Sequence, residues 1–365
     1  MKSNRLLYLV CAFTAITALA SWALPAGAQE KKRRGPRALA VLEMGPAETS
    51  AAAANGRKPL IAGVGFPRLL PVAVLDGGEY YDATLYQATP IPLAVQAGTV
   101  YDVQRSGIPQ ELFTVQQPTQ LHGSWVATGK LQPAVADTAS KNEPAKPQLE
   151  GDAPPRLRRN APATERSSLP AKPAISPASL ANVAAAHSLL AISDAQAYET
   201  RPYLYSWSPQ QQRQLTKEML RLAQAELAAY THCRVVAGSK SCLAKLENMQ
   251  LRAFDLETNN DIELVLAARA PKKSMAQEQQ QYLYIQVVGR YGSDARLQRV
   301  FATVTDDAHL DSDGRLEFID AVDADGDGRG ELLFRRVHTR TQSFELYRVG
   351  RERMWKLFDG AESNL

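Results

Sequence analysis

The chain lacks the short motifs by which many enzymes are identified. Its 365 residues contain five histidines that stand apart in the sequence, and no G-x-S-x-G elbow, phosphate-binding loop or HExxH helix occurs. These absences exclude the common signatures of serine hydrolases, P-loop proteins and zinc proteases. We therefore expect a non-catalytic protein. A secreted hydrolase that uses a pair of carboxylates, as glycoside hydrolases do, leaves no short motif and is the alternative.

The chain also lacks a strong excess of charge of either sign. Its 42 Lys and Arg exceed its 38 Asp and Glu by a net charge of +4, and this falls to +2 if Lys2 and Arg5 are removed with an export signal. Binding to nucleic acid depends on a strongly basic surface that neutralises phosphates. We therefore expect no nucleic-acid partner.

Cysteine is scarce, and this limits the metal and redox chemistry available. Of the three cysteines, Cys11 lies in an apolar N-terminal run, which leaves Cys233 and Cys242 in the mature chain. No C-x-x-C motif occurs, and His232 alone adds too few ligands for a zinc site. An even pair of cysteines in an exported protein predicts a disulfide between Cys233 and Cys242.

The N-terminus has the organisation of an export signal. A basic start precedes the uncharged apolar run 6–24, and Ala26-Gly27-Ala28 provides a cleavage site with small residues. This predicts a signal peptide over residues 1–28, a periplasmic or secreted mature protein, and no stable membrane insertion after cleavage. The alternative is an envelope protein anchored by an uncleaved N-terminus, although the basic residues 31–34 would then have to cross the bilayer.

The composition changes twice along the mature chain. Residues 38–130 contain short apolar runs separated by turn residues, such as Asp76-Gly77-Gly78, and this predicts a small antiparallel β domain. Residues 131–180 hold nine of the chain's 22 prolines, and no aromatic residue occurs from 126 to 197. Such a segment buries too little apolar surface to offset the entropy of ordering, so it predicts a disordered Pro/Ala-rich linker.

Two segments after the linker have helical patterns. The run 180–192 predicts a short helix. A longer helix is predicted to begin at Ser208-Pro209, because serine is a good N-cap and proline fits the first turn. Its apolar residues fall on one stripe, which is expected to cover the sheet that follows. The stripe consists of Leu215, Met219, Leu222, Ala223, Leu227 and Tyr230.

The last part of the chain, within a predicted domain over residues 200–365, contains an internal repeat. The segment 255–266 aligns without a gap with 323–334, and Val288-Gly289-Arg290 aligns with Val349-Gly350-Arg351. Each unit is predicted to form a strand, an acidic loop, two further strands, a turn and a last strand. The fold class is therefore mainly β, with a C-terminal antiparallel module of two propeller-blade-like repeats.

The acidic loops are the candidate metal sites. In the second loop Asp323, Asp325, Asp327 and Glu331 occupy positions 1, 3, 5 and 9, with a glycine at position 6. Carboxylates about 4 Å apart repel by roughly 4 kcal/mol at an effective dielectric of 20, so gathering four of them favours a bound cation. Hard oxygen ligands at alternating positions suit Ca²⁺. An EF-hand is excluded because Phe334 stands at position 12, where that motif requires glutamate.

The first loop has a weaker set of oxygen ligands. Asn260 replaces the glycine at position 6, where we predict a left-handed backbone conformation that asparagine tolerates well. An acidic turn that binds no ion is the alternative for both loops. The candidate ligands of the first loop are Asp255, Glu257, Asn259, Asp261 and Glu263.

These loops resemble the calcium-binding loops of FG-GAP and VCBS-type repeat proteins, in which a D-x-[DN]-x-D-G-x-x-D segment joins two strands of a propeller blade. The resemblance covers roughly residues 249–358. It implies side-chain oxygens from the four second-loop carboxylates, the carbonyl oxygen of Arg329 at position 7, and a structural Ca²⁺. We expect an exported β-rich protein that binds an unknown protein or glycan, or acts as a scaffold, at the cell envelope.

Overall fold

The computed structural model describes seven ranges of the chain. The predicted signal peptide, residues 1–28, lies outside the described residues, and so does the predicted linker beyond Pro133. The described ranges are 35–44, 67–121, 123–133, 188–193, 201–233, 244–272 and 280–365.

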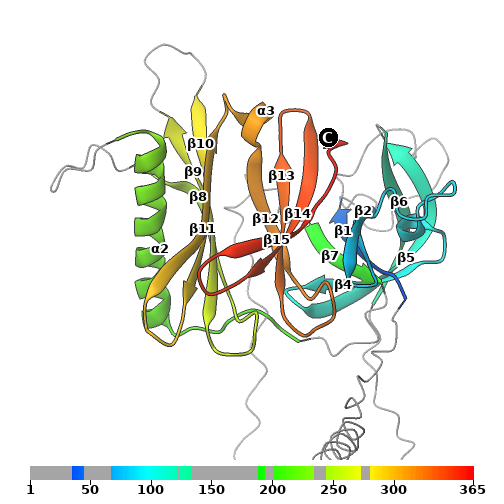
Figure 1. The fold of residues 1–365 in the computed structure, drawn as a ribbon, viewed down its shortest axis with the longest axis horizontal. Helices are drawn as coiled ribbons and strands as arrows, with labels where there is room; N and C mark the ends of the chain where they lie inside the picture. The colour runs from blue at the N-terminus through cyan, green and yellow to red at the C-terminus, as the bar shows by residue number, and fades with distance from the viewer. Residues whose placement is uncertain are drawn as a thin grey trace, which may run out of the picture.

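The N-terminal part forms a closed antiparallel barrel, which agrees with the small antiparallel β domain expected from the sequence. The strand order is β1-β7-β4-β5-β6-β2-β3, and β1 also pairs with β2, so six strands close a ring and β3 extends it (Figure 1). Tyr101 and Phe113 are fully buried inside the ring. The elements are β1 (Arg37–Met44), β2 (Pro67–Asp76), β3 (Glu79–Asp82), the 3-10 helix η2 (Leu93–Val95), β4 (Val100–Arg105), β5 (Ile108–Leu121), β6 (Ser124–Pro133) and β7 (Ser188–Ser193).

The segment predicted as a helix over 180–192 contains a strand instead. β7 lies between β1 and β4 and pairs antiparallel with both. Its residues are covered on both faces of the sheet, since Ala191 faces the barrel interior while Leu190 and Ile192 face the neighbouring sheet. A strand buried on both faces has a continuous apolar sequence. Hydrophobic periodicity cannot distinguish such a sequence from that of a buried helix.

The two predicted repeats each form a four-stranded antiparallel meander. In both, the first two strands are joined by the acidic loop, which confirms the predicted order of elements. Blade 1 contains β8 (Glu247–Phe254), β9 (Ile262–Lys272), β10 (Gln281–Tyr291) and β11 (Leu297–Asp306). Blade 2 follows the short helix α3 (Leu310–Asp313) and contains β12 (Arg315–Val322), β13 (Glu331–Val337), β14 (Thr341–Val349), β15 (Met354–Asp359) and the short strand β16 (Ser363–Asn364).

The predicted amphipathic helix is α2 (Pro209–Tyr230), and it covers the outer face of blade 1 (Figure 1). Its N-cap is Ser208, whose side chain accepts a hydrogen bond from the backbone of Gln211 at 3.2 Å. The buried side of the helix sits close to β10, because a Cβ added at Gly289 would lie only 2.8 Å from the sulfur of Met219.

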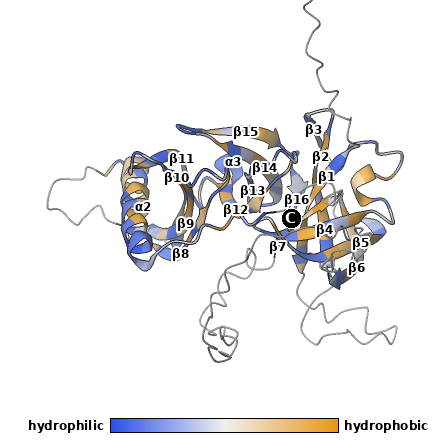
Figure 2. Ribbon diagram, turned by 90° about the horizontal axis from the view of Figure 1, so that it is seen from below, coloured by the Kyte–Doolittle hydropathy of each residue, from blue (hydrophilic) through white to orange (hydrophobic). Residues whose placement is uncertain are grey.

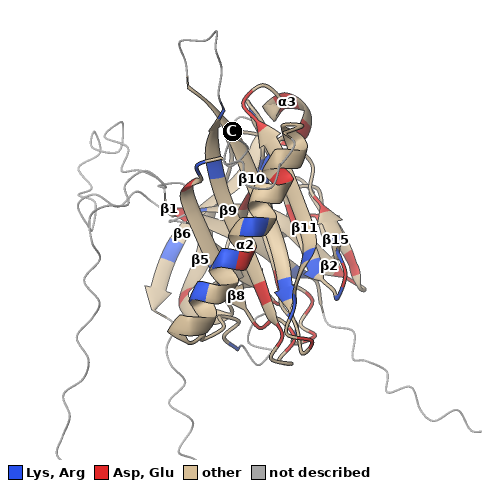
Figure 3. Cartoon of the chain, turned by 90° about the vertical axis from the view of Figure 1, so that its left-hand side faces the viewer, with Lys and Arg blue, Asp and Glu red and all other residues tan. Residues whose placement is uncertain are grey.

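The solvent-facing side of α2 is polar and carries basic side chains (Figure 3), among them the exposed Arg213, Lys217 and Arg221. These three residues are spaced four apart, so they share one face of the helix. Among the described residues, no helix is both long and apolar enough to cross a membrane.

The layers stack in the order α2, blade 1, blade 2 and barrel (Figure 2). Aromatic side chains pack where the two blades meet. The ring centroid of Phe318 in blade 2 lies 5.6 Å from that of Phe254 in blade 1 and 5.3 Å from that of Phe334 in its own blade. Such tilted and edge-on pairs add about 0.5–1.5 kcal/mol each beyond the area they bury. Leu333 and Leu346 of blade 2 then meet the barrel wall. Both outer faces of the blade pair are therefore covered, one by a helix and one by the barrel.

Candidate metal centre in the acidic loops

The two acidic loops lie side by side at one end of the blades, the lower end in Figure 1. The backbone N–H of Gly330 donates to the carbonyl of Leu256 at 2.8 Å. Arg201 joins the same two loops, since its guanidinium donates to the carbonyl oxygens of Gly328 at 3.0 Å, Asp255 at 3.0 Å and Leu256 at 2.6 Å. Stacking blade 1 on blade 2 therefore brings together loops that are distant in sequence.

The backbone follows the same path through both loops. Positions 4 and 6 have positive φ in each: 57° at Thr258 and 61° at Asn260, against 74° at Gly326 and 86° at Gly328. The predicted left-handed conformation of Asn260 is confirmed. Thr258 is a β-branched residue in a region that such residues rarely adopt, so the loop fold, and not local preference, determines its conformation.

Three aspartates of the second loop converge. One carboxylate oxygen from each of Asp323, Asp325 and Asp327 lies within 4.8 Å of the others, and no second group of three such side chains is found in the described ranges. The Asp323 carboxylate organises the turn, because it accepts backbone N–H groups from Gly326 at 2.5 Å and Gly328 at 3.0 Å. Burial, the largest influence, raises the pKa of Asp323.

Glu331, predicted as a fourth ligand, has its oxygens engaged elsewhere. It is fully buried; Oε2 accepts the backbone N–H of Ala324 at 2.9 Å, and Oε1 accepts Nε of Arg348 at 3.0 Å. Burial raises the pKa of Glu331 to about 8, although both of these donors favour the charged form. Glu331 thus holds the start of the loop to the neighbouring strand.

Arg348 is a central residue of this site that was not identified from the sequence. Its guanidinium lies 2.9 Å from a carboxylate oxygen of Asp325 and 3.3 Å from one of Asp327. Arg348 therefore already supplies a positive charge to the site. The register explains its position, since Leu332 opposes Tyr347, and the preceding Glu331 consequently lies opposite Arg348.

The first repeat has the same buried pair. Glu263 is directly opposite Arg290 in the β9–β10 ladder, and Nε of Arg290 lies 3.5 Å from its Oε1. The other oxygen of Glu263 accepts the N–H of Leu256 at 3.1 Å, and burial raises the pKa of this glutamate to about 7. Arg290 is thus equivalent to Arg348 and not to Arg351, with which the sequence alignment had matched it.

The remaining predicted ligands of the first loop do not converge on one point. Asp261 pairs with Arg290. Asp255 accepts the N–H of Asn259 at 3.2 Å, and the amide of Asn259 donates to Glu257 at 3.0 Å. These contacts are those of a folded turn, and they leave a weaker case for an ion in the first loop than in the second.

Two other predicted residues are Arg329 and Cys233. Arg329, whose carbonyl was proposed as the position 7 ligand, donates its own N–H to the Asp327 carboxylate at 2.8 Å. Cys233 directly follows the C-terminal turn of α2. Cys242 lies outside the described residues, so the disulfide between them stays a prediction.

Asp306, a buried carboxylate away from the loops, has a lowered pKa, whereas the pKa values of Asp323 and Glu331 are raised. Asp306 ends β11 and is 1% exposed, with Nζ of Lys272 at 2.6 Å and Nδ1 of His309 at 2.6 Å. Burial alone would raise the pKa of Asp306, but hydrogen bonds from these two side chains outweigh it and lower the pKa to about 2.

This lowered pKa predicts a loss of stability in acid. A carboxyl whose pKa is lower in the folded state stabilises the fold above its unfolded pKa near 4, and the contribution is lost as the pH falls towards 2. Between these values we expect the free energy of unfolding of the wild type to fall by about 1–2 kcal/mol more than that of Asp306→Asn. Urea unfolding from pH 2 to 6 measures this difference, and parallel curves for the two proteins would contradict it.

Comparison with known proteins adds no assignment to these observations. The chain matches no family model, no curated protein and no solved structure. The resemblance of its loops to FG-GAP and VCBS-type repeats therefore rests on the loop residues themselves.

Proposed function

We propose that this protein is an exported, non-catalytic β-rich module, periplasmic or secreted, with a binding or scaffolding role at the cell envelope. Its second acidic loop binds a structural Ca²⁺, as the resemblance to FG-GAP and VCBS-type repeats implies. The observation that carries the proposal is the convergence of Asp323, Asp325 and Asp327, whose ligand oxygens lie within 4.8 Å of one another.

The donor set fits a hard divalent cation. Ca²⁺ prefers carboxylate, carbonyl and water oxygens, and the three aspartates supply the first of these. The side chains of Asp325 and Asp327 are 28% and 31% exposed, so an ion and its waters reach them from solvent. Arg348 contacts Asp325, Asp327 and Glu331, and Arg37 donates to the backbone carbonyl of Asp323 at 2.9 Å. Four carboxylates face these two cations, so the loop keeps surplus negative charge that an ion would offset.

Arg348 also limits how much the ion contributes to folding. Because its guanidinium already pairs with the buried Glu331, we expect the loop to keep its backbone fold when calcium is removed. Calcium then adds stability by binding the native state in preference to the unfolded chain. This differs from zinc fingers, in which the metal is required for folding at all.

Calcium titration tests the metal site. Extracellular calcium modules bind with a dissociation constant of roughly 10⁻⁴–10⁻³ M. At 10 mM Ca²⁺ the wild type should therefore be stabilised by about 1.4–2.7 kcal/mol relative to the protein in EDTA. Isothermal titration calorimetry should show heat release for the wild type and none for Asp325→Ala.

A variant in the other loop provides the matched control. Glu257 occupies the same position in the first loop as Asp325 does in the second. Glu257→Ala should retain the calcium response. If the wild type gives no heat, or if calcium stabilises the wild type and Asp325→Ala equally, the metal site is wrong.

A further inference from the structure

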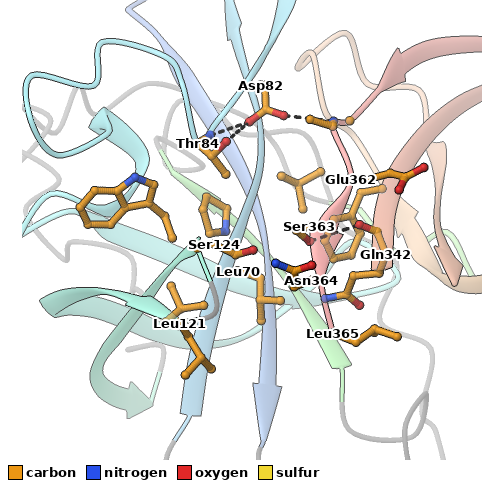
Figure 4. A pocket seen from close by; sticks show the side chains of 18 of the residues that line it. Leu70, Asp82, Thr84, Leu121, Ser124, Gln342, Glu362, Ser363, Asn364 and Leu365 are labelled. Atoms are coloured by element: carbon orange, nitrogen blue, oxygen red, sulfur yellow. Dashed lines mark hydrogen bonds between the residues drawn. The ribbon is translucent and has the colours of Figure 1, made fainter. Parts of the chain in front are cut away.

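A cleft of about 490 Å³ separates the barrel from the end of blade 2 (Figure 4). It forms where two barrel strands diverge, since β2 pairs with β6 only at Arg68–Thr128 and Leu69–Ala127. Val72 and Val126, further along the two strands, both line the cleft. Its volume is within the range of about 300–1,000 Å³ typical of ligand pockets.

The rim of the cleft gathers exposed apolar side chains. Of the nine large hydrophobic residues exposed in the described ranges, three line it: Leu85 at 71%, Leu121 at 40% and Leu365 at 53%. Single exposed hydrophobic residues are ordinary, but several around one concave site indicate an interaction surface. Figure 4 shows Leu121 and Leu365 on opposite sides of the opening.

An unsatisfied hydrogen-bond acceptor lies at the same place. Gln342 is 7% exposed and lines the cleft, towards which its side chain points (Figure 4). Within the described part of the chain, its Oε1 is buried without a hydrogen-bond partner. A buried polar atom left unpaired costs roughly 1–3 kcal/mol. A ligand N–H that donates a hydrogen bond to Oε1, once the Gln342 side chain turns it into the cleft, would recover that cost.

The charged side chains at the cleft are of both signs. Arg335 is 8% exposed, and its guanidinium nitrogens lie 2.7 Å from Glu43 and 3.0 Å from Glu317. Of the charged side chains that line the cleft in the described ranges, Glu43, Asp82 and Glu362 are acidic, and Arg68 and Arg335 are basic. Because acidic groups outnumber basic ones, and the rim is apolar, this chemistry favours a peptide over a phosphate or another anion.

Where β2 and β6 diverge they no longer pair with each other, so each strand has a backbone edge there. On one side, Trp125 and Val126 of β6 pair with Gln120 and Thr119 of β5. On the other side, which faces β2, the ladder within the described ranges stops at Ala127. An extended peptide adds to such an edge through its own N–H and C=O groups, while alternate side chains enter neighbouring pockets.

We propose that this cleft binds an extended peptide segment of a partner protein, with a bulky apolar side chain between Leu121 and Leu365 and an N–H group donated to Gln342. The inference rests on the proposed binding role and names the class of partner for it. The peptide pairs with the free edge of β6 and places its apolar side chain in the cleft.

Peptide selection on the mature chain tests the proposal. Random nine-residue peptides displayed on phage are selected on wild-type residues 29–365, and enriched sequences are measured as fluorescent peptides by anisotropy. We expect Leu121→Asp and Gln342→Leu to weaken binding at least ~10-fold. N-methylation of alternate peptide amides should abolish binding, because it removes the donors that pair with a strand edge.

The control variant is at a residue of the same strand as Leu121, with the same exposed fraction. Ile108 is 40% exposed, as Leu121 is, and it lies at the other end of β5. Ile108→Asp should bind within about twofold of the wild type, since exposed substitutions away from the site have small effects. All three variants should show wild-type circular dichroism.

Several results would overturn the proposal. These are no enriched peptide, equal binding by Leu121→Asp, insensitivity to N-methylation, or Leu121-dependent binding of glycans on an array without binding of peptides. Peptide binding that appears only after deletion of residues 47–64 would assign the cleft to the chain's own segment. Calcium titration of the same protein separates the two proposals, because a protein that binds Ca²⁺ but no peptide contradicts only the cleft assignment.

Discussion

A fragment ending at residue 133 is expected not to fold, although it contains the whole domain 38–130 that was delimited from the sequence. Without β7 (Ser188–Ser193) the ring is open between β1 and β4, and both lose a hydrogen-bonded neighbour. The barrel residues Leu39, Val41 and Val72, which contact blade 2, would also be exposed. We expect residues 29–133 alone to lack a cooperative thermal transition and to aggregate, as measured by circular dichroism and size-exclusion chromatography.

The matching control supplies the missing strand in trans. Residues 29–133 and 188–365, co-expressed as separate chains, should associate and show a cooperative transition, because the barrel contacts among the described residues are all restored without a covalent connection. A fragment that starts at residue 201 should not rescue the barrel, since it lacks β7. If residues 29–133 fold alone to a stable monomer, the barrel does not depend on β7.

The second large effect is expected at a buried polar cluster that joins all three β layers. Asp320 of blade 2 is 3% exposed and accepts hydrogen bonds from the backbone N–H of Ser106 at 2.7 Å and its Oγ at 2.9 Å. Arg252 of blade 1 lies 2.5 Å from the same carboxylate. Ser106 belongs to the turn between β4 and β5 of the barrel.

Asp320→Ala should therefore lower the free energy of unfolding by about 3 kcal/mol. Removing one partner of a buried ion pair costs roughly 3–5 kcal/mol, and we take the lower end because the Arg252 side chain is 31% exposed. The loss includes the unpaired N–H of Ser106, which stays buried. Urea unfolding measures the effect as a shift in midpoint at constant slope.

An exposed aspartate provides the comparison. Asp359 pairs with Lys356 at 3.0 Å, but its side chain is 61% exposed. Surface pairs of this kind contribute about 0–1 kcal/mol, so Asp359→Ala should change the midpoint little. Similar losses for Asp320→Ala and Asp359→Ala would show that the cluster does not hold the layers together.

The sequence predicted those features that depend on nearby residues. The N-cap at Ser208, the apolar stripe of α2, the order of strands in the two blades and the left-handed turn at Asn260 all follow from patterns within a few residues. Helix capping, strand alternation and positive φ are local effects, so a single sequence carries enough information to recognise them.

The features that the sequence did not predict depend on partners that are distant in the chain. The central residues 189–192 of β7 are all apolar, and only the covering of both faces by the barrel and blade 2 makes the segment a strand. Arg348 was missed as the partner of Glu331 because its position follows from the β13–β14 register, which the loop residues do not determine.

By itself, then, the amino-acid sequence determined the repeat, the acidic loops and the helix that covers blade 1. The tertiary structure decided that three aspartates converge while Glu331 turns to an arginine, that a strand from beyond the linker closes the barrel, and that a cleft opens beside Gln342. The physical reason is that hydrogen bonding and backbone strain act over a few residues, whereas burial and charge pairing depend on which distant segments the stacked layers bring into contact.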